Sequence, residues 1–259
     1  MEQETKTQEA KAIEKEAHRL LEEHKYHEAA ELFYRAANAY RKYGKHHPAA
    51  MSLASAASCW ALKSGEATFY YAARDYEKAA KEAEKSEDWE YTALLYKHAA
   101  VCYEKDKEYL GFSECYFQSK ECYRRFLWFS IFHPQKLKDS KEWFSGNLGR
   151  RFILWLVLSF SSLLWGHGER PQRTVLFGCF FIFLAAALYT QGHLLKESQF
   201  IRPSLSESIY FSVATFLTVG YGDLIPVGFN RSIAILESLG GIFIFPIFIT
   251  GLCRKYLRE

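Results

Sequence analysis

The second part of this 259-residue sequence has little charge. Residues 151–259 carry 9 basic and 6 acidic side chains, whereas residues 1–150 carry 24 of each. A surface that faces water needs more charge than the second part has, so one soluble globular domain is excluded. The formal net charge is only +3, which gives no reason to expect a nucleic-acid partner. We therefore expect two parts, one in water and one in a lipid bilayer.

Paired cysteines and an N-terminal leader are also missing. The six cysteines form no Cys-x-x-Cys pair, and so few in a chain of 259 residues exclude a disulfide framework. Small buried thiols in a reducing compartment are the simpler interpretation, which predicts a cytosolic location for residues 1–150. The opening MEQETKTQEA has neither a basic nor an apolar region, so we expect no cleavable signal peptide.

Groups that catalyse reactions are scarce in the sequence. We find no nucleophile–base pair, no cluster of metal ligands and no phosphate-binding loop. His24 and His27 would share a helix face, but a third and a fourth metal ligand are missing. An apolar helix with Arg or Lys at every third position is absent too, so we expect no voltage sensor. The sequence predicts a protein that is not an enzyme and has no cofactor.

Residues 9–125 have the composition of packed helices, with abundant Ala, Glu, Lys, Leu and Tyr and a single proline, Pro48. Apolar side chains recur at helical spacing, as in the run 29–40. The stretch 36–40 (AANAY) resembles 99–103 (AAVCY), and such small-plus-aromatic endings recur about every 20 residues. One helix per 20 residues gives a helical hairpin per about 40, the period of an α-solenoid.

This part resembles the tetratricopeptide or SNAP-like class of helical repeats, although its motifs are degenerate. The resemblance implies a concave surface that binds a peptide, which would make residues 1–130 a protein-interaction or regulatory domain. The alternative is a domain that only drives assembly. The sequence leaves both interpretations open.

Three apolar segments follow in the second part. Residues 152–165 are 14 uncharged residues, and a helix of that length covers ~21 Å, less than the ~30 Å hydrocarbon core. Residues 174–190 and 232–253 number 17 and 22 and predict two secure spans. Only Glu237 carries charge in the last segment, and its cost of about 3 kcal/mol is outweighed by the surrounding Ile, Leu and Phe.

Basic residues predict the orientation of the two secure spans. They lie before the first span and after the second, at Arg170, Arg173, Arg254, Lys255 and Arg258. Since an excess of Lys and Arg marks cytoplasmic flanks, both chain ends would be cytoplasmic. The segment 152–165 would then lie along the inner leaflet. If it crossed the bilayer instead, the helical repeat would lie outside, against the argument from free cysteines.

The loop between the secure spans carries the most informative motif. Residues 206–217 predict a short apolar helix, capped by Ser204 or Ser206, with Glu207 in its first turn. Next come Thr218, Val219, Gly220, Tyr221, Gly222 and Asp223. This TVGYGD run between two apolar spans resembles the selectivity filter of potassium channels. The resemblance covers about residues 174–253, laid out as outer helix, pore helix, filter and inner helix.

The resemblance implies that main-chain oxygens coordinate K⁺ as the permeant ion. An ion in a narrow pore exchanges its hydration shell for oxygen ligands, which the carbonyls of Thr218, Val219, Gly220 and Tyr221 and the Thr218 hydroxyl would supply. Successive carbonyls point one way only if alternate residues reach positive φ, which Gly220 and Gly222 allow at low cost. One chain supplies one row of carbonyls, so we expect a homotetramer around the pore axis.

Two aromatic residues of the pore helix are expected to support the filter. Val219 and Tyr221 would face the pore helix, where Tyr210 and Phe211 lie. Ala214 stands seven residues before Tyr221, where some members of the family carry an acidic group that pairs with the filter aspartate. Asp223 is therefore expected to lack that partner.

The inner helix contains three residues that suggest a gate for the pore and one acidic residue that suggests support for the filter. Gly240 and Gly241 lower the cost of bending, and Pro246 removes a backbone hydrogen bond, so we expect a hinge at Gly241 and a constriction over 245–248. A statically kinked helix is the alternative. Glu237 either hydrogen-bonds a pore-helix residue behind the filter, which we favour, or faces the cavity and concentrates cations.

These observations predict an all-α protein with four segments. They are a cytosolic helical-repeat domain (1–130), a linker with an interfacial helix (131–173), a pore domain (174–253) and a short cytoplasmic tail (254–259). The expected function is passive, potassium-selective conduction across the cell membrane, modulated by the repeat domain. A nonselective cation channel and a membrane-anchored scaffold with a silent pore are the alternatives.

Overall fold

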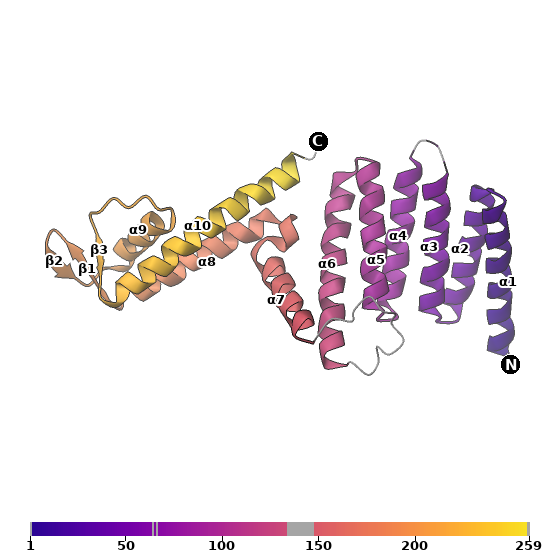
Figure 1. The fold of residues 1–259 in the computed structure, drawn as a ribbon, viewed down its shortest axis with the longest axis horizontal. Coiled ribbons are helices and arrows are strands. Elements are labelled where there is room, and N and C mark those ends of the chain that lie inside the picture. The colour runs from indigo at the N-terminus through magenta and orange to yellow at the C-terminus, as the bar shows by residue number, and fades with distance from the viewer. Residues whose placement is uncertain (1, 64, 66, 134–147, 258–259) are drawn as a thin grey trace. The chain divides into compact units, whose positions relative to one another are not determined.

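The computed structural model describes residues 2–63, 65, 67–133 and 148–257 (Figure 1). The chain divides into two compact units, Met1–Phe160 and Ser161–Arg258, which we call unit 1 and unit 2. The division falls inside the segment 131–173 that the sequence predicts as a linker. Helices make up almost all of the regular structure, as the predicted all-α class requires.

Unit 1 contains a row of six helices, each of which packs against the next in the chain (Figure 1). They are α1 (Glu2–Glu22), α2 (Tyr26–Lys42), α3 (His46–Leu62), α4 (Thr68–Glu84), α5 (Trp89–Lys105) and α6 (Tyr109–Phe132). From α2 onward the helices begin at residues 26, 46, 68, 89 and 109, which confirms the predicted spacing of about 20 residues per helix.

Alanine dominates the contacts between these helices. In α2, Ala36 and Ala37 are fully buried beside Phe33, and the matching Ala99 and Ala100 of α5 are 0% and 2% exposed. Small side chains let the helix backbones approach, while the aromatic rings fill the space between them. Helices α2 and α5 each have 17 residues and start 63 residues apart, so the internal similarity relates helices three apart rather than successive hairpins.

The cysteines of unit 1 are packing residues. Cys59, Cys102, Cys115 and Cys122 are free and buried. Burial raises the pKa of the Cys115 and Cys122 thiols to about 12. A thiol with so high a pKa stays protonated at neutral pH and is unreactive, in keeping with the predicted role of these cysteines as small buried side chains.

Unit 2 is built on two long helices that lie side by side (Figure 1). These are α8 (Pro171–Tyr189) and α10 (Phe229–Tyr256), and the short helix α9 (Leu205–Phe216) packs against both. Helix α7 (Leu148–Trp165) crosses the division between the units, and the one-turn helix η2 (Gly166–Gly168) joins it to α8. Ser204 is the residue that caps α9, through a capping box with Glu207.

Three helices among the described residues are long and apolar enough to cross a membrane. They are Leu148–Gly168, Pro171–Tyr189 and Phe229–Tyr256. The last two correspond to the predicted spans. Helix α7 begins four residues before the apolar run 152–165, so its 18 residues extend ~27 Å, longer than the run alone implies. The interfacial location of 152–165 stays a prediction.

A small antiparallel sheet in unit 2 was not predicted. Its strands are β1 (His193–Lys196), β2 (Gln199–Ile201) and β3 (Ile225–Val227), in the order β2-β1-β3. The turn between β1 and β2 uses Glu197 and Ser198, both with positive φ. Such two-residue turns usually carry Asn-Gly or Asp-Gly, so no familiar sequence signal marks this hairpin.

Candidate functional site

The TVGYGD run forms an irregular loop between α9 and β3. Thr218, Gly220 and Gly222 have φ values of 55°, 59° and 79°, and the intervening Val219 and Tyr221 are not among the residues with positive φ. This alternation turns successive peptide units so that their carbonyls can face one side. The two glycines adopt the expected conformation, whereas Thr218 adopts it at a cost, because a β-branched residue disfavours positive φ.

The direction of the loop is set where it leaves the pore helix α9. The N–H groups of Thr218 and Val219 donate hydrogen bonds to the carbonyls of Thr215 and Ala214, at 3.0 and 2.9 Å. The buried Ala214 therefore anchors the start of the loop through its carbonyl.

In a single chain this loop lies on the surface. Tyr221 is 69% and Val219 is 49% exposed, and Thr218, Gly220 and Gly222 are exposed as well. Irregular backbone at membrane depth is stable only where it faces protein or a water-filled path, because lipid provides no hydrogen-bond partners.

Tyr210 supports the loop through two contacts. Its ring stacks on that of Tyr221, with centroids 6.1 Å apart and planes 10° apart. Its hydroxyl donates a hydrogen bond of 2.9 Å to Asp223, whose other carboxylate oxygen accepts from the Leu224 N–H at 3.1 Å. Asp223 thus has a partner in Tyr210 that the sequence did not predict.

Phe211 lies on a different side of α9 from Tyr210, because successive residues of a helix point about 100° apart. Its buried ring meets the ring of Tyr189 in α8 edge-on, with centroids 4.9 Å apart. It shares a core with Leu194, Leu224 and Ile233. Phe211 thus attaches α9 to α8, and its support of the filter stays a prediction.

Glu237 lies behind the pore helix, buried to 1% exposure. Ser212 of α9 donates a short hydrogen bond to one carboxylate oxygen, and the Tyr189 hydroxyl of α8 donates to the other at 2.6 Å. The carboxyl group of α10 therefore links α8, α9 and α10. This is the first of the two arrangements described above for Glu237, and Ser212 and Tyr189 are partners that spacing alone does not identify.

At Gly241, α10 approaches the end of α9 closely. A Cβ atom there would lie 1.9 Å from the carbonyl oxygen of Phe216, the last residue of α9. At Gly240 the nearest atom would be a ring carbon of Phe181, at 2.6 Å. Helix α10 runs unbroken through both glycines and through Pro246. Close packing therefore explains why position 241 is a glycine, whether or not the helix bends there.

A cavity of about 180 Å³ lies where the loop meets the inner helix. The structure brings together here Thr218 of the TVGYGD loop and three of the residues predicted for the hinge and constriction, Gly241, Phe245 and Pro246. Its lining is Phe216, Leu217, Thr218, Gly241, Ile242, Phe245 and Pro246.

The outer end of the loop is held by the sheet and an ion pair. β3 follows the loop and pairs with β1, in register His193 with Val227. Lys196 of β1 donates to Glu207 at the start of α9, at 2.9 Å. This contact with Lys196, and the capping hydrogen bonds from Ser204, lower the pKa of Glu207 to about 2. The capping pattern was visible in the sequence, but its lysine partner was not.

The opposite end of unit 2 contains a second linkage. Buried Glu169, between η2 and α8, pairs with Arg254 near the end of α10, with 3.4 Å between the charged atoms. Arg173 and Thr174 of α8 donate to the carbonyls of Ser162 and Leu164 at the end of α7, at 2.8 and 3.0 Å. The end of α7, the start of α8 and the end of α10 are thereby joined.

Comparison of the sequence with known proteins finds similarity to ion channels in unit 2. Residues 174–258 match the family model described as an ion channel. The match starts in α8 and covers the pore helix, the TVGYGD loop and the inner helix. A stretch of 46 residues is 48% identical to Protein LctB of Geobacillus stearothermophilus and 46% identical to Protein LctB of Bacillus caldotenax.

The likeness to these two proteins is local. Each alignment covers 18% of this chain and 34% of the relative, so the chain spans about a third of the length of the curated relatives it matches. No solved structure matches the chain significantly. The comparisons thus support an ion-channel unit in residues 174–258 and carry no information on the helical row of unit 1.

Proposed function

We propose that the protein is a potassium-selective channel whose pore is assembled from four copies of the chain. The observation that carries this proposal is positive φ at alternate residues of a TVGYGD loop, held between a pore helix and an inner helix. Such a backbone supports a row of four carbonyls and one hydroxyl, oxygen donors of the kind that replace the hydration shell of K⁺. The family match over residues 174–258 supports the channel class.

Assembly is proposed because one chain leaves the loop uncovered. A single row of carbonyls cannot surround an ion, and exposed polar backbone is costly in lipid. Four loops around one axis satisfy both requirements, because each then lines a shared water-filled path. The exposed apolar side chains of α8 and α10, such as Phe180, Phe183, Phe243 and Phe245, would face lipid or neighbouring subunits.

The orientation we propose puts the ends of the chain in the cytoplasm. Arg170 and Arg173 begin α8, and Arg254 and Lys255 end α10. Since α8 and α10 are antiparallel neighbours and Glu169 pairs with Arg254, these basic residues share one side of the membrane, the side that favours Lys and Arg. Helix α7 would then lie at the inner leaflet, with unit 1 in the cytosol.

Modulation by unit 1 forms the last part of the proposal. A helical row with a concave surface is suited to bind a peptide, and α7 is the chain's path from that row to unit 2. Because the end of α7 is bonded to α8 and near Arg254 of α10, a displacement of α7 would act on the cytoplasmic end of the inner helix.

A flux assay in liposomes tests the conduction proposal. The purified chain is expected to pass K⁺ much faster than Na⁺, and Gly220→Ala should abolish the flux, because positive φ is strained for alanine. Gly44→Ala is the matched control: Gly44 also has positive φ and open space around it, but it lies between α2 and α3. Equal K⁺ and Na⁺ fluxes would indicate a nonselective cation channel, and no flux from intact tetramers would indicate a scaffold.

A further inference from the structure

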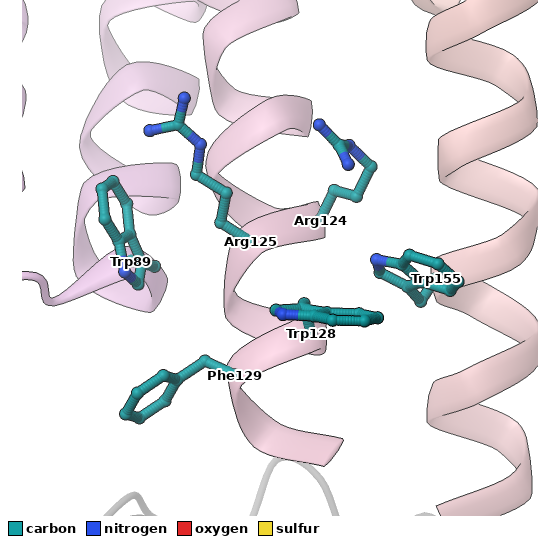
Figure 2. A pocket seen from close by; sticks show the side chains of 6 residues that line it. All are labelled: Trp89, Arg124, Arg125, Trp128, Phe129 and Trp155. Carbon is teal, nitrogen blue, oxygen red and sulfur yellow. The ribbon is translucent and has the colours of Figure 1, made fainter. Parts of the chain in front are cut away.

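Unit 1 contains a cavity of about 370 Å³ that the proposed conduction does not use. Its walls come from the start of α5, the second half of α6 and the middle of α7 (Figure 2). The lining consists of four aromatic rings and two guanidinium groups: Trp89, Trp128, Phe129, Trp155, Arg124 and Arg125. This volume lies in the range of small-ligand sites, which is about 300–1,000 Å³.

Aromatic rings of α6 and α7 meet beside the cavity. Trp128 of α6 and Trp155 of α7 have centroids 4.9 Å apart, and Phe152 lies 6.0 Å from Trp155. Because Trp128 belongs to α6 and Trp155 to α7, a ligand held between their rings would touch both helices.

The two arginines lie at the same end of the cavity in Figure 2. The Arg125 guanidinium lies over the Trp89 ring, 5.0 Å from its centroid, and has no carboxylate partner among the described residues. Arg124 pairs with Glu121 at 2.6 Å, yet its Nε is buried without a hydrogen-bond acceptor. A guanidinium that stacks on a ring keeps its N–H edge available for a phosphate, which it can bind in bidentate fashion.

The surroundings of the cavity combine basic and apolar groups. Arg150 and Arg151, at the start of α7, are close enough to Tyr123 of α6 to interact with it electrostatically. Phe132 is 56% and Ile153 is 60% exposed, and α7 itself is apolar and long enough to cross a membrane. Tryptophan and arginine beside exposed apolar side chains are typical of the boundary between an anionic membrane surface and its hydrocarbon.

We propose that this cavity binds an anionic phospholipid through its phosphate group. Arg124 and Arg125 would bind the phosphate oxygens, and Trp89, Trp128 and Trp155 would surround the glycerol and the first acyl carbons. A nucleotide offers the same phosphate chemistry with a base that can stack on tryptophan. The exposed apolar side chains beside the cavity favour the lipid, since a soluble nucleotide has no use for them. Occupancy holds α7 against α5 and α6, and this inference does not depend on conduction through unit 2.

Calorimetric titration of the full chain in a neutral detergent tests this site. The probes are the short-chain lipids dioctanoyl phosphatidylglycerol and dioctanoyl phosphatidylcholine, together with ATP. We expect phosphatidylglycerol to bind at least about 10-fold more tightly than phosphatidylcholine and than ATP, because only it combines a net negative phosphate with acyl chains. Equal affinities for the two lipids would overturn the proposal, and binding of ATP alone would overturn the lipid as the ligand.

Variants of Arg124 and Arg125 show whether these arginines bind the phosphate of the lipid. The double variant Arg124→Gln/Arg125→Gln should weaken phosphatidylglycerol binding by about 10-fold or more, since charge-assisted hydrogen bonds are lost. Lys120→Gln removes one charge from α6 outside the lining and should change the affinity less than about 2-fold. Should the double glutamine variant unfold, Arg124→Lys/Arg125→Lys replaces it. It keeps the charge without the bidentate geometry, so wild-type affinity in this variant would overturn the assignment.

Discussion

At the scale of single residues, the carboxyl group of Glu237 is the least expected feature of unit 2. It is an acidic side chain within an apolar helix, and it is stabilised by two hydroxyl donors from two other helices. A buried carboxyl that loses a donor is left with an unsatisfied oxygen, which is more costly than the net gain from making the bond. The contribution of this group to stability is therefore measured best by removing its partners one at a time.

Tyr189→Phe removes the donor to one oxygen of Glu237 and leaves the ring in place against Phe211. We expect the protein to be destabilised by about 1–3 kcal/mol, because a buried acceptor becomes unsatisfied. Thermal unfolding in detergent measures the effect. Tyr256→Phe is the control, since Tyr256 lies in α10 and is 64% exposed; equal effects from the two changes would contradict the structural role of the Tyr189 hydroxyl.

Tyr210→Phe tests the support of the TVGYGD loop, which we propose to be the selectivity filter. The change keeps the ring that stacks on Tyr221 and removes the hydrogen bond to Asp223. We expect little change in the unfolding temperature, because an exposed hydrogen bond contributes only about 0.5–1.5 kcal/mol, but a K⁺ flux that decays sooner as the loop loses its conducting conformation. A flux with the wild-type time course would show that the stacking contact alone is sufficient.

At the scale of elements, α9 and α10 meet so closely that one position accepts only glycine. The Phe216 carbonyl occupies the space where a side chain at Gly241 would begin. Flexibility of the inner helix and close packing both predict glycine at this position. A substitution at Gly241 therefore disturbs the packing of α10 against α9, even if it has no effect on bending.

We expect Gly241→Ala to be destabilising by about 3 kcal/mol or more, because a backbone carbonyl of another helix would have to move. Gly240→Ala should be tolerated better, since its Cβ would meet a Phe181 side chain that can rotate away. Thermal unfolding of the two variants, run side by side, gives the order. If Gly241→Ala is no less stable than Gly240→Ala, α9 and α10 must be farther apart at Gly241 than in the structure.

The contacts of Glu207 at the start of α9 predict that the stability of the protein depends on pH. The pKa of Glu207 is lowered to about 2 in the folded protein by Lys196 and the Ser204 cap, from an ordinary value of 4.5. A lowered pKa stabilises the folded state above pH 4.5, and this stabilisation is lost as the pH falls toward 2. The stability difference between wild type and Glu207→Gln should thus shrink between pH 5 and pH 2.

The exposed Glu197 provides the control for this pH series. Glu197→Gln removes the same charge from the turn between β1 and β2. If the stability difference between wild type and Glu207→Gln were constant over this pH range, or if Glu197→Gln reproduced its change with pH, the ion pair and cap would not be its source.

At the scale of the whole chain, unit 1 and unit 2 expose different kinds of surface. The helices of unit 1 bury alanine faces and expose charge to water, whereas unit 2 exposes apolar side chains and one polar loop. Helix α7 is the element that belongs to both units. Its last turn is bonded to α8, and the Glu169–Arg254 pair lies beside it.

Removal of residues 1–140 tests modulation by unit 1. If unit 1 acts through α7, the truncated chain should differ from the full chain in open probability in bilayers, while K⁺ selectivity is unchanged. Glu169→Gln in the full chain should also shift open probability, because it breaks the ion pair to the inner helix. Unaltered gating in the truncated chain would exclude modulation by unit 1, whatever the effect of Glu169→Gln.

Much of the architecture was predictable because it follows local rules. The helix spacing of unit 1 came from small and aromatic residues recurring about every 20 positions, and the spans of α8 and α10 came from apolar length. The β1–β2 hairpin was not predictable, since its turn residues Glu197 and Ser198 are unusual at positive φ. Helix α7 was underestimated, because Gly149, Arg150 and Arg151 separate Leu148 from the apolar run and are nonetheless helical.

The amino-acid sequence by itself determined the helical row, the two apolar helices and the TVGYGD loop, because each depends on residues close together in the chain. Only the tertiary structure decided which side chains cooperate around that loop. Tyr189, Ser212 and Glu237 come from three helices, and Glu169 and Arg254 lie 85 positions apart. Burial of a polar group requires partners wherever the packing provides them, and packing is a property of the folded chain rather than of neighbouring residues.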